Sequence, residues 1–329
     1  MNTIAIVMPY FGKFPNYFPL WLTSCAHNPT IDWLIFTDDK FEYNYPENVK
    51  VVYKSFAEIV TMFQDNFDFE IILPEPYKLC DYKPTYGEVF SDYLQKYDYW
   101  GFGDLDLIFG DIRSFLNYEI LNSHDKILTH GSFCILKNTK QNNSIYRKEI
   151  NGKLKFKEVY TDIKNRGFDE YGKEAFNSIC MNENLKIYTN NLIFADIDSW
   201  KKHFKLTGVL DLCDHNEKKE LEWEKKEEKH NSIFAFEKGK LFRYFIKNNQ
   251  ISKKEYLYVH FQKRFMICDK WQDLGNDFLM IPNKFVEYTG NVDKSYLDKY
   301  GKKLFFSNRR IKRQLYITIR MFLKNKVGF

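Results

Sequence analysis

Three short apolar runs lie within the first 53 residues and constrain the fold more than any other feature of the sequence. They are Thr3–Met8, Ile31–Thr37 and Val49–Tyr53, and each has the length of a strand that is buried on both faces. Phe18–Cys25 lies between the first two runs and has a helical pattern. This order predicts a β-α-β beginning, and therefore an α/β fold around a largely parallel sheet.

The first two runs end in residues that suit ligand binding. Pro9-Tyr10 follows the first run, and Asp38-Asp39 follows the second. Open α/β sheets bind ligands at the carboxyl ends of their strands, so we expect a site at this edge. No Gly-x-Gly-x-x-Gly follows the first run, so the fingerprint of dinucleotide-binding proteins is absent.

The composition is that of a folded soluble protein. Of the 329 residues, 44% are hydrophobic, 28% are charged and 18% are aromatic. The aromatic share fits either a cleft that stacks sugars or bases, or a genome rich in Phe and Tyr codons. Six cysteines form no Cys-x-x-Cys pair, and no secretory signal precedes Ile4, which predicts reduced thiols in a cytoplasmic protein.

The positive charge is concentrated in the tail. Ten of the 49 lysines and arginines follow Asp298, which leaves 39 basic against 44 acidic residues before it, or a charge of −5. This distribution argues against a nucleic-acid-binding protein and for one local basic segment. Residues 299–329 predict a basic amphipathic helix that begins at Ser307 or Asn308, which suits an anionic membrane surface or packing on the main domain.

Further elements are predicted along the chain. Thr85–Glu88 has the spacing of a capping box before a helix that continues to Tyr97. A charged excursion is expected at about 214–231. The other expected elements are a strand over Lys126–Leu136, a helix over Asp169–Asn182, and strands over Leu185–Phe194, Ile233–Phe245 and Tyr256–Phe261.

The segment Tyr97–Ile112 (YDYWGFGDLDLIFGDI) places acidic residues in an apolar run. If Trp100–Leu107 is a strand that runs into a turn, Asp104 and Asp106 lie on the same side. Two close carboxylates repel each other unless a cation lies between them, and a divalent cation can bridge a diphosphate. The alternative is an ordinary turn at the end of a strand.

This segment resembles the DxD motif of GT-A-fold glycosyltransferases, and more narrowly that of bacterial capsule, O-antigen and exopolysaccharide glycosyltransferases. The resemblance covers roughly residues 1–265 and is most specific at 97–112. It implies a single GT-A-like (Rossmann-like) domain with a mixed central sheet, over residues 1–298. It also implies transfer of a sugar from a nucleotide-sugar with Mn²⁺ or Mg²⁺. Asp104 would contact the ribose or the donor sugar and share in the metal site, and Asp106 would hold the metal.

The resemblance implies a further metal ligand late in the chain, for which His260 is the candidate. Tyr256, Tyr258 and His260 alternate onto one face of an expected strand, and Lys263 follows in position to hold phosphate oxygens. The alternative is a structural histidine at the end of a strand before a basic turn.

The nucleotide-sugar is expected at the carboxyl edge of the first strands. Pro9, Tyr10 and Phe11 would line the base pocket, with Asp38 near the ribose or uracil. Lys83 would meet a phosphate or a base carbonyl, with Asp81 to order it. For Lys83 and Asp81, the alternative is that this segment, with Lys83-Pro84, only marks the boundary of a helix.

Inverting enzymes of the GT-A fold place an acid at the start of a helix beneath the acceptor, which implies Asp169 or Glu170 as catalytic base. The alternative is that Asp169 is a helix N-cap. His130-Gly131 resembles the segment that lines the sugar and acceptor cleft, and its alternative is a bulged strand. The His-x-x-Lys spacing of His260 and Lys263 also occurs in retaining members of the fold, so the stereochemistry of the reaction stays open.

Together these features predict a metal-dependent hexosyltransferase. The donor would be a UDP-sugar, galactosyl-like, and the acceptor a glycan or a lipid-diphosphate-linked sugar in cell-surface polysaccharide biosynthesis. The reaction would be inverting, at the cytoplasmic face of the cell membrane, where the tail would bind. The alternatives are a retaining enzyme, or a non-enzymatic module that binds carbohydrate or membrane.

Overall fold

A computed structural model describes residues 2–170, 172–199, 201–207, 231–268, 270–288 and 290–302. The strands are β1 Ile4–Pro9, β2 Ile31–Thr37, β3 Val49–Tyr53, β4 Tyr99–Gly103, β5 Leu107–Phe109, β6 Lys126–His130, β7 Phe133–Lys137, β8 Ile187–Tyr188, β9 Phe194–Ile197, β10 Leu206–Thr207, β11 Ser232–Glu237, β12 Lys240–Lys247, β13 Gln250–Tyr256, β14 Tyr258–His260, β15 Phe278–Ile281 and β16 Lys284–Glu287. The helices are α1 Phe18–Ala26, α2 Phe56–Gln64, α3 Leu79–Tyr82, α4 Tyr86–Val89, α5 Ser91–Leu94, α6 Ile112–Phe115, α7 Tyr118–Ser123, α8 Lys140–Asn143, α9 Lys155–Tyr160, α10 Phe176–Asn182 and α12 Lys294–Tyr300, with 3₁₀ turns at Pro76–Lys78, Lys83–Thr85, Ile145–Arg147 and Trp271–Asp273.

A seven-stranded sheet forms the centre of the described chain, in the order β3-β2-β1-β4-β7-β6-β8. The strands β3, β2, β1 and β4 are parallel, whereas β7 is antiparallel to both β4 and β6. The predicted α/β class with a mixed central sheet is therefore confirmed, and the strands expected over Ile31–Thr37 and Val49–Tyr53 have the predicted bounds.

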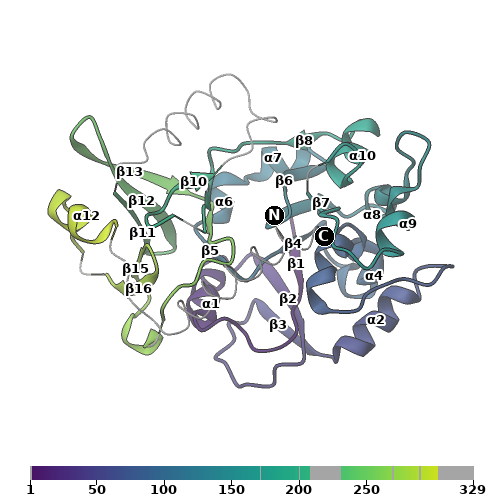
Figure 1. Cartoon of the computed structure of the whole chain (residues 1–329), viewed down its shortest axis with the longest axis horizontal. Helices are drawn as coiled ribbons and strands as arrows, with labels where there is room; N and C mark the ends of the chain where they lie inside the picture. The colour runs from purple at the N-terminus through teal and green to yellow at the C-terminus, as the bar shows by residue number, and fades with distance from the viewer. Residues whose placement is uncertain are drawn as a thin grey trace, which may run out of the picture.

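The central sheet is buried on both faces, which explains the uninterrupted apolar runs. Alternate residues of β1 enter two different cores: Ile4, Ile6 and Met8 enter one, and Ala5 and Val7 the other. Helices α2, α4, α8 and α9 cover one face, and α1 lies on the other, towards the strands β11 to β16 (Figure 1).

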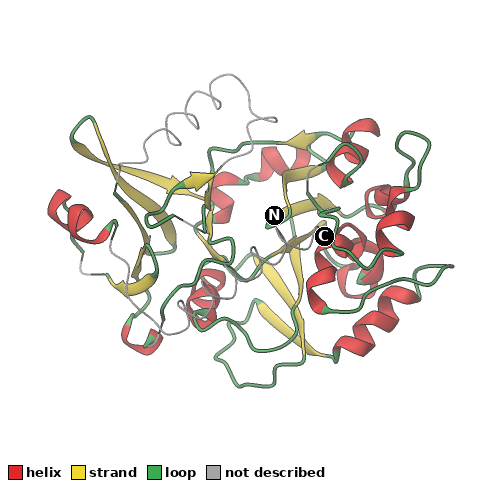
Figure 2. Cartoon of the chain, in the orientation of Figure 1, coloured by secondary structure: helices red, strands yellow, loops and turns green. Residues whose placement is uncertain are grey.

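Two further sheets complete the described chain. A four-stranded sheet has the order β10-β9-β14-β5, and a five-stranded antiparallel sheet has the order β13-β12-β11-β15-β16. Figure 2 shows the five-stranded sheet on the side of the molecule opposite to the main group of helices. The four-stranded sheet, called the small sheet below, pairs β5 with β14 and so brings together two distant parts of the sequence at the site.

The capping box expected at Thr85–Glu88 is wrong. Thr85 already has helical backbone angles, and its hydroxyl donates to the carbonyl of Tyr82 at 2.8 Å. Glu88 instead accepts a hydrogen bond from Arg147. The chain is already helical from Pro76 onward, so short helical turns (α3, the turn at Lys83–Thr85, α4 and α5) replace the single helix that was expected.

Several predicted elements divide or shorten. The strand expected over Trp100–Leu107 ends at Gly103, and a turn separates it from β5. Lys126–Leu136 is a hairpin rather than one strand, because Gly131 and Ser132 reverse the chain between β6 and β7. The remaining divisions are Leu185–Phe194 into β8 and the start of β9, Ile233–Phe245 into β11 and β12, and Tyr256–Phe261 into the end of β13 and β14.

The helix expected over Asp169–Asn182 begins only at Phe176, with Ala175 as its N-cap. Asp169 and Glu170 therefore lie in a turn before the helix, and the alternative reading of Asp169 as an N-cap is also wrong.

Two predictions fall on residues that are not described. The charged excursion at about 214–231 lies outside the described residues apart from Asn231, and the tail helix at 299–329 lies outside them apart from 299–302. Within the described ranges, no helix has both the length and the apolar character that crossing a bilayer requires.

Gly101 tests how tightly β4 is packed. A Cβ at this position would lie 2.4 Å from the Cys134 carbonyl oxygen and 2.9 Å from Ile6 Cδ1. We expect Gly101→Ala to lower the free energy of unfolding by about 1–3 kcal/mol through overpacking, measured by urea unfolding. Gly103→Ala on the same strand is the control, because its Cβ would meet nothing nearer than 3.6 Å. Equal stability of the two variants would contradict this packing.

Candidate active site

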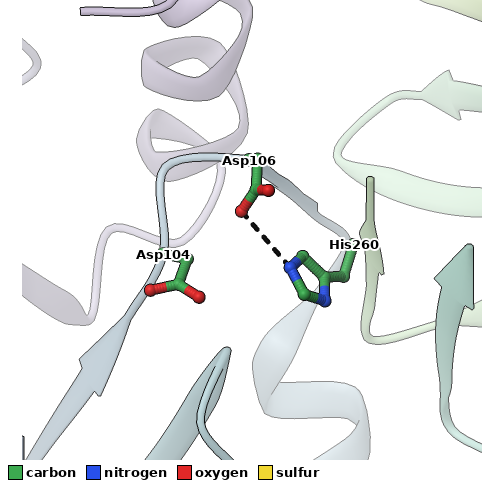
Figure 3. Close-up of side chains that lie close together, drawn as sticks. All are labelled: Asp104, Asp106 and His260. Carbon is green, nitrogen blue, oxygen red and sulfur yellow. Dashed lines mark ion pairs between the residues drawn. The ribbon is translucent and has the colours of Figure 1, made fainter. Parts of the chain in front are cut away.

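Three side chains converge where β4 and β14 end and β5 begins. Asp104 and Asp106 lie in the turn between β4 and β5, and His260 is the last residue of β14. One possible ligand atom from each of the three lies within 4.8 Å of the other two. Figure 3 shows the three side chains close together, with the contact between Asp106 and His260 dashed.

The registers of the small sheet explain this convergence. β14 pairs with β5 so that His260 lies opposite Leu107, and the Phe261 amide donates to the Asp106 carbonyl oxygen at 2.9 Å. On the other side of the turn, the Asp104 amide donates to the Ser132 carbonyl oxygen at 2.9 Å. Backbone pairing therefore positions the acidic turn between β14 and the β6–β7 hairpin.

Asp106 and His260 form an ion pair. His260 Nε2 lies 3.3 Å from Asp106 Oδ1. Burial alone would raise the pKa of Asp106, but His260 and the Lys263 amide outweigh it and lower the pKa to about 2. Burial likewise opposes the charge on His260, yet Asp106 and Asp196 raise its pKa well above the ordinary value. In the protein without a bound ion, the positive charge of the His260 imidazole therefore offsets the negative charge of Asp106 and Asp196.

Asp196 is a member of the site that the sequence reading missed. It lies on β9 directly beside His260 in the parallel register, and its Oδ1 is 2.6 Å from His260 Nδ1. Gln262 and Thr207 donate to the other oxygen, Oδ2. Asp196 therefore fixes the ring so that Nε2 faces Asp106. An acid inside the apolar strand FADI is the same signal that singled out Asp104, but β9 is short and was not predicted as a separate strand.

Lys83 connects the acidic turn to the hairpin. Its Nζ lies 2.7 Å from Asp104 Oδ1, 2.7 Å from the Gly131 carbonyl oxygen and 3.4 Å from Asp169 Oδ2. Burial alone would lower the pKa of Lys83, but Asp104 and Asp169 help to hold it well above its ordinary value. Lys83 is thus a buried cation held by carboxylates.

The predicted bases Asp169 and Glu170 lie against the hairpin at Gly131. A Cβ on Gly131 would lie 2.5 Å from Asp169 Oδ2 and 2.7 Å from Glu170 Oε1, so no larger residue fits while both carboxylates keep these positions. Asp169 is buried, and burial raises its pKa to about 7, an effect that Lys83 offsets in part. Glu170 as a whole residue is exposed to solvent. Partial burial of its carboxylate nevertheless raises the pKa of this group.

Asp81 does not order Lys83, contrary to expectation. It forms a buried ion pair with Lys78 at 2.7 Å, and both side chains are almost inaccessible to solvent. Asp81 also accepts hydrogen bonds from the backbone amides of Arg166 and Phe168. Its role in the structure is to fix the segment that carries Asp169.

The residues expected to hold the nucleotide lie at the carboxyl ends of β1 and β2. Tyr10 is half-buried, and burial, with smaller effects from Asp106 and Asp39, raises its pKa. Phe11 packs against Phe56 in the opposite core. Pro9 ends β1 beside them.

Asp38 lies at the same edge, where it caps the loop after β1. Its Oδ1 accepts the Gly12 amide at 2.7 Å, and Gly12 has a φ of +85°, which favours glycine. Asp38 therefore shapes the edge at which a nucleotide would bind.

His130 lies inside the hairpin wall rather than in open solvent. Its Nε2 lies 3.2 Å from Asn191 Oδ1, and its ring packs edge-on against Phe194 at 4.4 Å. Burial lowers the pKa of His130, and Asp196, two residues after Phe194, opposes this shift. His130 therefore belongs to the same electrostatic neighbourhood as the site.

Lys263 contacts the site through its backbone and leaves its ammonium near the surface. Its amide donates to Asp106 Oδ2 at 2.6 Å, and its Nζ donates to the Tyr77 hydroxyl at 2.5 Å. Gln262 and Lys263 have φ angles of +47° and +60°, which non-glycine residues rarely adopt. These two residues thus form a strained turn. The Gln262 side chain holds Asp196 in place, and the Lys263 amide holds Asp106.

Asp104, Asp106 and His260 have the chemistry to hold a divalent cation. Two carboxylates and an imidazole on half-buried residues match the ligands that Mn²⁺ accepts, and carboxylates suit Mg²⁺. The hydrogen bond that His260 Nδ1 donates to Asp196 leaves Nε2 as the nitrogen that faces this site. The residues present therefore fit the group that the sequence resemblance implies.

A model of one protein family matches residues 6–289, which is most of the chain. The chain belongs to the family DUF6625. This family is described as one of unknown function. No curated protein matches the chain.

Several solved structures are similar to this DUF6625 chain. An active-site mutant of LgtC is 12% identical, with a TM-score of 0.35 over 59% of this chain and 74% of that chain. The galactosyltransferase LgtC in complex with donor and acceptor sugar analogues is 12% identical, with a TM-score of 0.32 over 59% of this chain and 75% of that one. The apo-form glycosyltransferase GlyE of Streptococcus pneumoniae TIGR4 is 11% identical, with a TM-score of 0.31 over 57% of this chain and 45% of that one. Because these identities are so low, the chemistry of this site is inferred from its own side chains and not from the solved structures.

The buried carboxyl of Asp169 predicts a pH-dependent stability. Its pKa is raised from 3.8 to about 7, so the folded chain keeps a proton that the unfolded chain loses in this interval. Stability is therefore lost as the pH rises from about 4 to about 7, by roughly 4 kcal/mol in all. We expect Asp169→Asn to remove this loss, so that the variant gains stability relative to wild type across the interval. Urea unfolding in chelator at several pH values measures the difference.

The control for this measurement is Asp162→Asn. Asp162 is partly exposed and its pKa is lowered by the Lys164 amide and Arg166, so its contribution changes only below pH 4. A difference between Asp169→Asn and wild type that stays constant from pH 4 to pH 8 would show that Asp169 titrates normally.

Proposed function

We propose that this chain is a metal-dependent glycosyltransferase that transfers a hexose, galactosyl-like, from a UDP-sugar to a hydroxyl of a glycan or lipid-linked acceptor. The observation that carries the proposal is the convergence of Asp104, Asp106 and His260, with ligand atoms within 4.8 Å, near the carboxyl ends of parallel strands. The resemblance of residues 97–112 to the GT-A DxD motif supports the same reaction.

The proposed reaction is a single displacement. The acceptor oxygen forms a bond to the anomeric carbon as the bond from that carbon to the diphosphate oxygen breaks. UDP leaves with the bonding electron pair, and the hydroxyl proton passes to a carboxylate base. Attack from the face opposite the leaving group inverts the anomeric centre.

The acidic turn would bind the charged part of the donor. Asp104, Asp106 and His260 would hold Mn²⁺ or Mg²⁺, which when bound neutralises charge on the departing diphosphate. Lys263 is exposed beside this turn, with its amide fixed on Asp106 and its ammonium resting on Tyr77. The ammonium can move from Tyr77 to a phosphate oxygen without disturbing the amide contact.

Glu170 is the better candidate for the base. Both acids lie at Gly131, but Asp169 is buried against Lys83, whereas Glu170 is exposed. A base must come within hydrogen-bonding reach of the acceptor hydroxyl, so exposure decides between them. The raised pKa of Glu170 also makes it a stronger base than an ordinary carboxylate.

Asp169 and Lys83 would act as positioning residues. Lys83 bridges Asp104, the Gly131 carbonyl and Asp169, so it fixes the acidic turn relative to the hairpin that faces the acceptor. With its side chain 7% exposed, Lys83 orients Asp104 better than it could meet a phosphate.

The physiological setting completes the proposal. Capsule and O-antigen sugars are added at the cytoplasmic face of the membrane in the enzymes that this sequence resembles, to acceptors linked to a lipid diphosphate. The basic segment after Asp298 suits the anionic surface of that membrane. We place the chain there as a peripheral protein.

Removal of one carboxylate tests the metal-dependent step. We expect Asp106→Asn to abolish transfer and to weaken metal-dependent UDP binding at least ~100-fold, since residues outside a metal's own ligands already contribute roughly 10- to 100-fold. Calorimetry of UDP binding with Mn²⁺, and again with chelator, measures the loss. Wild type in chelator should behave like the variant.

Asp111→Asn is the matched control, because Asp111 lies in the same segment and caps α6 through Ser114, a role that asparagine also fills. Full transfer by Asp106→Asn in the presence of chelator would refute the metal site.

A pair of amide variants separates the base from the positioning residue. We expect Glu170→Gln to lower kcat by roughly 10²- to 10⁴-fold with little change in the KM for the donor. Asp169→Asn should retain more activity, because Lys83 keeps its contacts with Asp104 and Gly131. Steady-state kinetics with a UDP-sugar measure both variants, and the opposite ranking would make Asp169 the base.

The anomeric configuration of the product, read by proton NMR, distinguishes the inverting from the retaining reaction. A retained configuration would overturn the assignment of either acid as an acceptor base while keeping the metal site. Binding of glycan with no transfer from any UDP-sugar would instead favour the non-enzymatic module.

A further inference from the structure

A cavity of about 430 Å³ lies apart from the residues described above. One wall is the outer surface of α1, including Thr23 and His27. The second wall is the loop after β2, with Phe41 and Asn44, and the third contains Trp271 from the segment before β15. None of the side chains assigned to the catalytic site lines it.

Aromatic side chains at this cavity face solvent rather than the core. Phe41 is 63% exposed and Trp271 is 36% exposed, and both line the cavity together with the half-buried Tyr43. Single exposed aromatic residues are common, but three around one hollow mark a binding surface. Tyr43 is anchored by Phe18 at 4.9 Å and packs against Phe41 at 4.8 Å, so the platform is held from below.

Polar groups at the rim have hydrogen-bonding capacity to spare. Glu42, Asn44 and Asn276 line the cavity, and no other described residue forms a side-chain hydrogen bond or ion pair with them. The loop itself is ordered, because Asp39 accepts the Phe41 amide at 3.0 Å. The rim therefore offers donors and acceptors on a fixed frame.

We propose that this cavity is a carbohydrate-binding site for uncharged sugar residues. A pyranose ring has an apolar C–H face that stacks on an aromatic ring, and hydroxyls that both donate and accept hydrogen bonds. The cavity pairs aromatic faces with two amides and one carboxylate. Within the described ranges no lysine or arginine lines it and Glu42 contributes a carboxylate, so the lining does not favour a phosphate. Its volume lies within the range of small-molecule sites.

Packed rings lead from the cavity to the carboxyl end of β1. Tyr43 contacts Phe14 at 5.7 Å, and Phe14 stacks on Tyr10 at 5.3 Å. Tyr10 follows Pro9, the last residue of β1. These contacts join the cavity to the edge at which the nucleotide would bind, a statement that rests on the proposed function, whereas carbohydrate binding itself does not.

The test is binding without nucleotide or metal. Maltopentaose, cellopentaose, chitotetraose and lacto-N-tetraose are titrated into the full chain in chelator, and binding is followed by ligand-observed NMR and calorimetry. We expect saturable binding of at least one of them, weakened at least 10-fold by Phe41→Ala/Trp271→Ala. Trp271→Ala alone should weaken it less. Failure of all four to bind, or equal binding by the double variant, would overturn the proposal.

Two controls make the result specific. Tyr118→Ala removes an aromatic side chain of similar exposure, 67%, on α7, and should bind as wild type does. Asp106→Asn should also bind the oligosaccharide normally, since Asp106 does not line the cavity. Glycan binding by a chain that transfers no sugar would keep the cavity and reject the proposed function, and transfer without glycan binding would do the reverse.

Discussion

The balance of charge around one short turn organises this molecule. Asp104, Asp106 and Asp196 lie close together on half-buried residues, where uncompensated carboxylates are costly. His260 and Lys83 supply the compensating charge from opposite sides. Lys83 is buried and His260 half-buried, and both cations are stabilised largely by nearby acids, so the acids and cations depend on each other. A divalent ion that enters this network adds positive charge where the protein already concentrates negative charge.

The fold assembles this network from distant parts of the sequence by backbone pairing. β14 lies between β5 and β9, so the register alone places His260 beside Asp196 and close to the acidic turn. The left-handed turn at Gln262 and Lys263 then directs one side chain to Asp196 and one amide to Asp106. Strain in that turn is offset by these contacts, and it sits where ligands are expected to bind.

The sequence predicted the parts of this arrangement that are local. Continuous apolar runs identified β1, β2 and β3, and an apolar strand interrupted by acids identified Asp104 and Asp106. The capping box failed because helical turns before Thr85 already determine its backbone. Asp196 escaped notice because its importance arises from a parallel pairing with β14, which no local pattern encodes. The buried ion pair of Asp81 with Lys78 was hidden for the same reason, since burial is a tertiary property.

The loop after β1 is held on both faces of the central sheet. Tyr10 packs into one core and Phe11 into the other, while Asp38 fastens the turn at Gly12. A segment clamped in this way has little conformational freedom left to lose when a ligand arrives. Recognition at this edge should therefore cost little entropy and proceed with small backbone rearrangement, so discrimination between nucleobases would arise from the rigid shape of the edge.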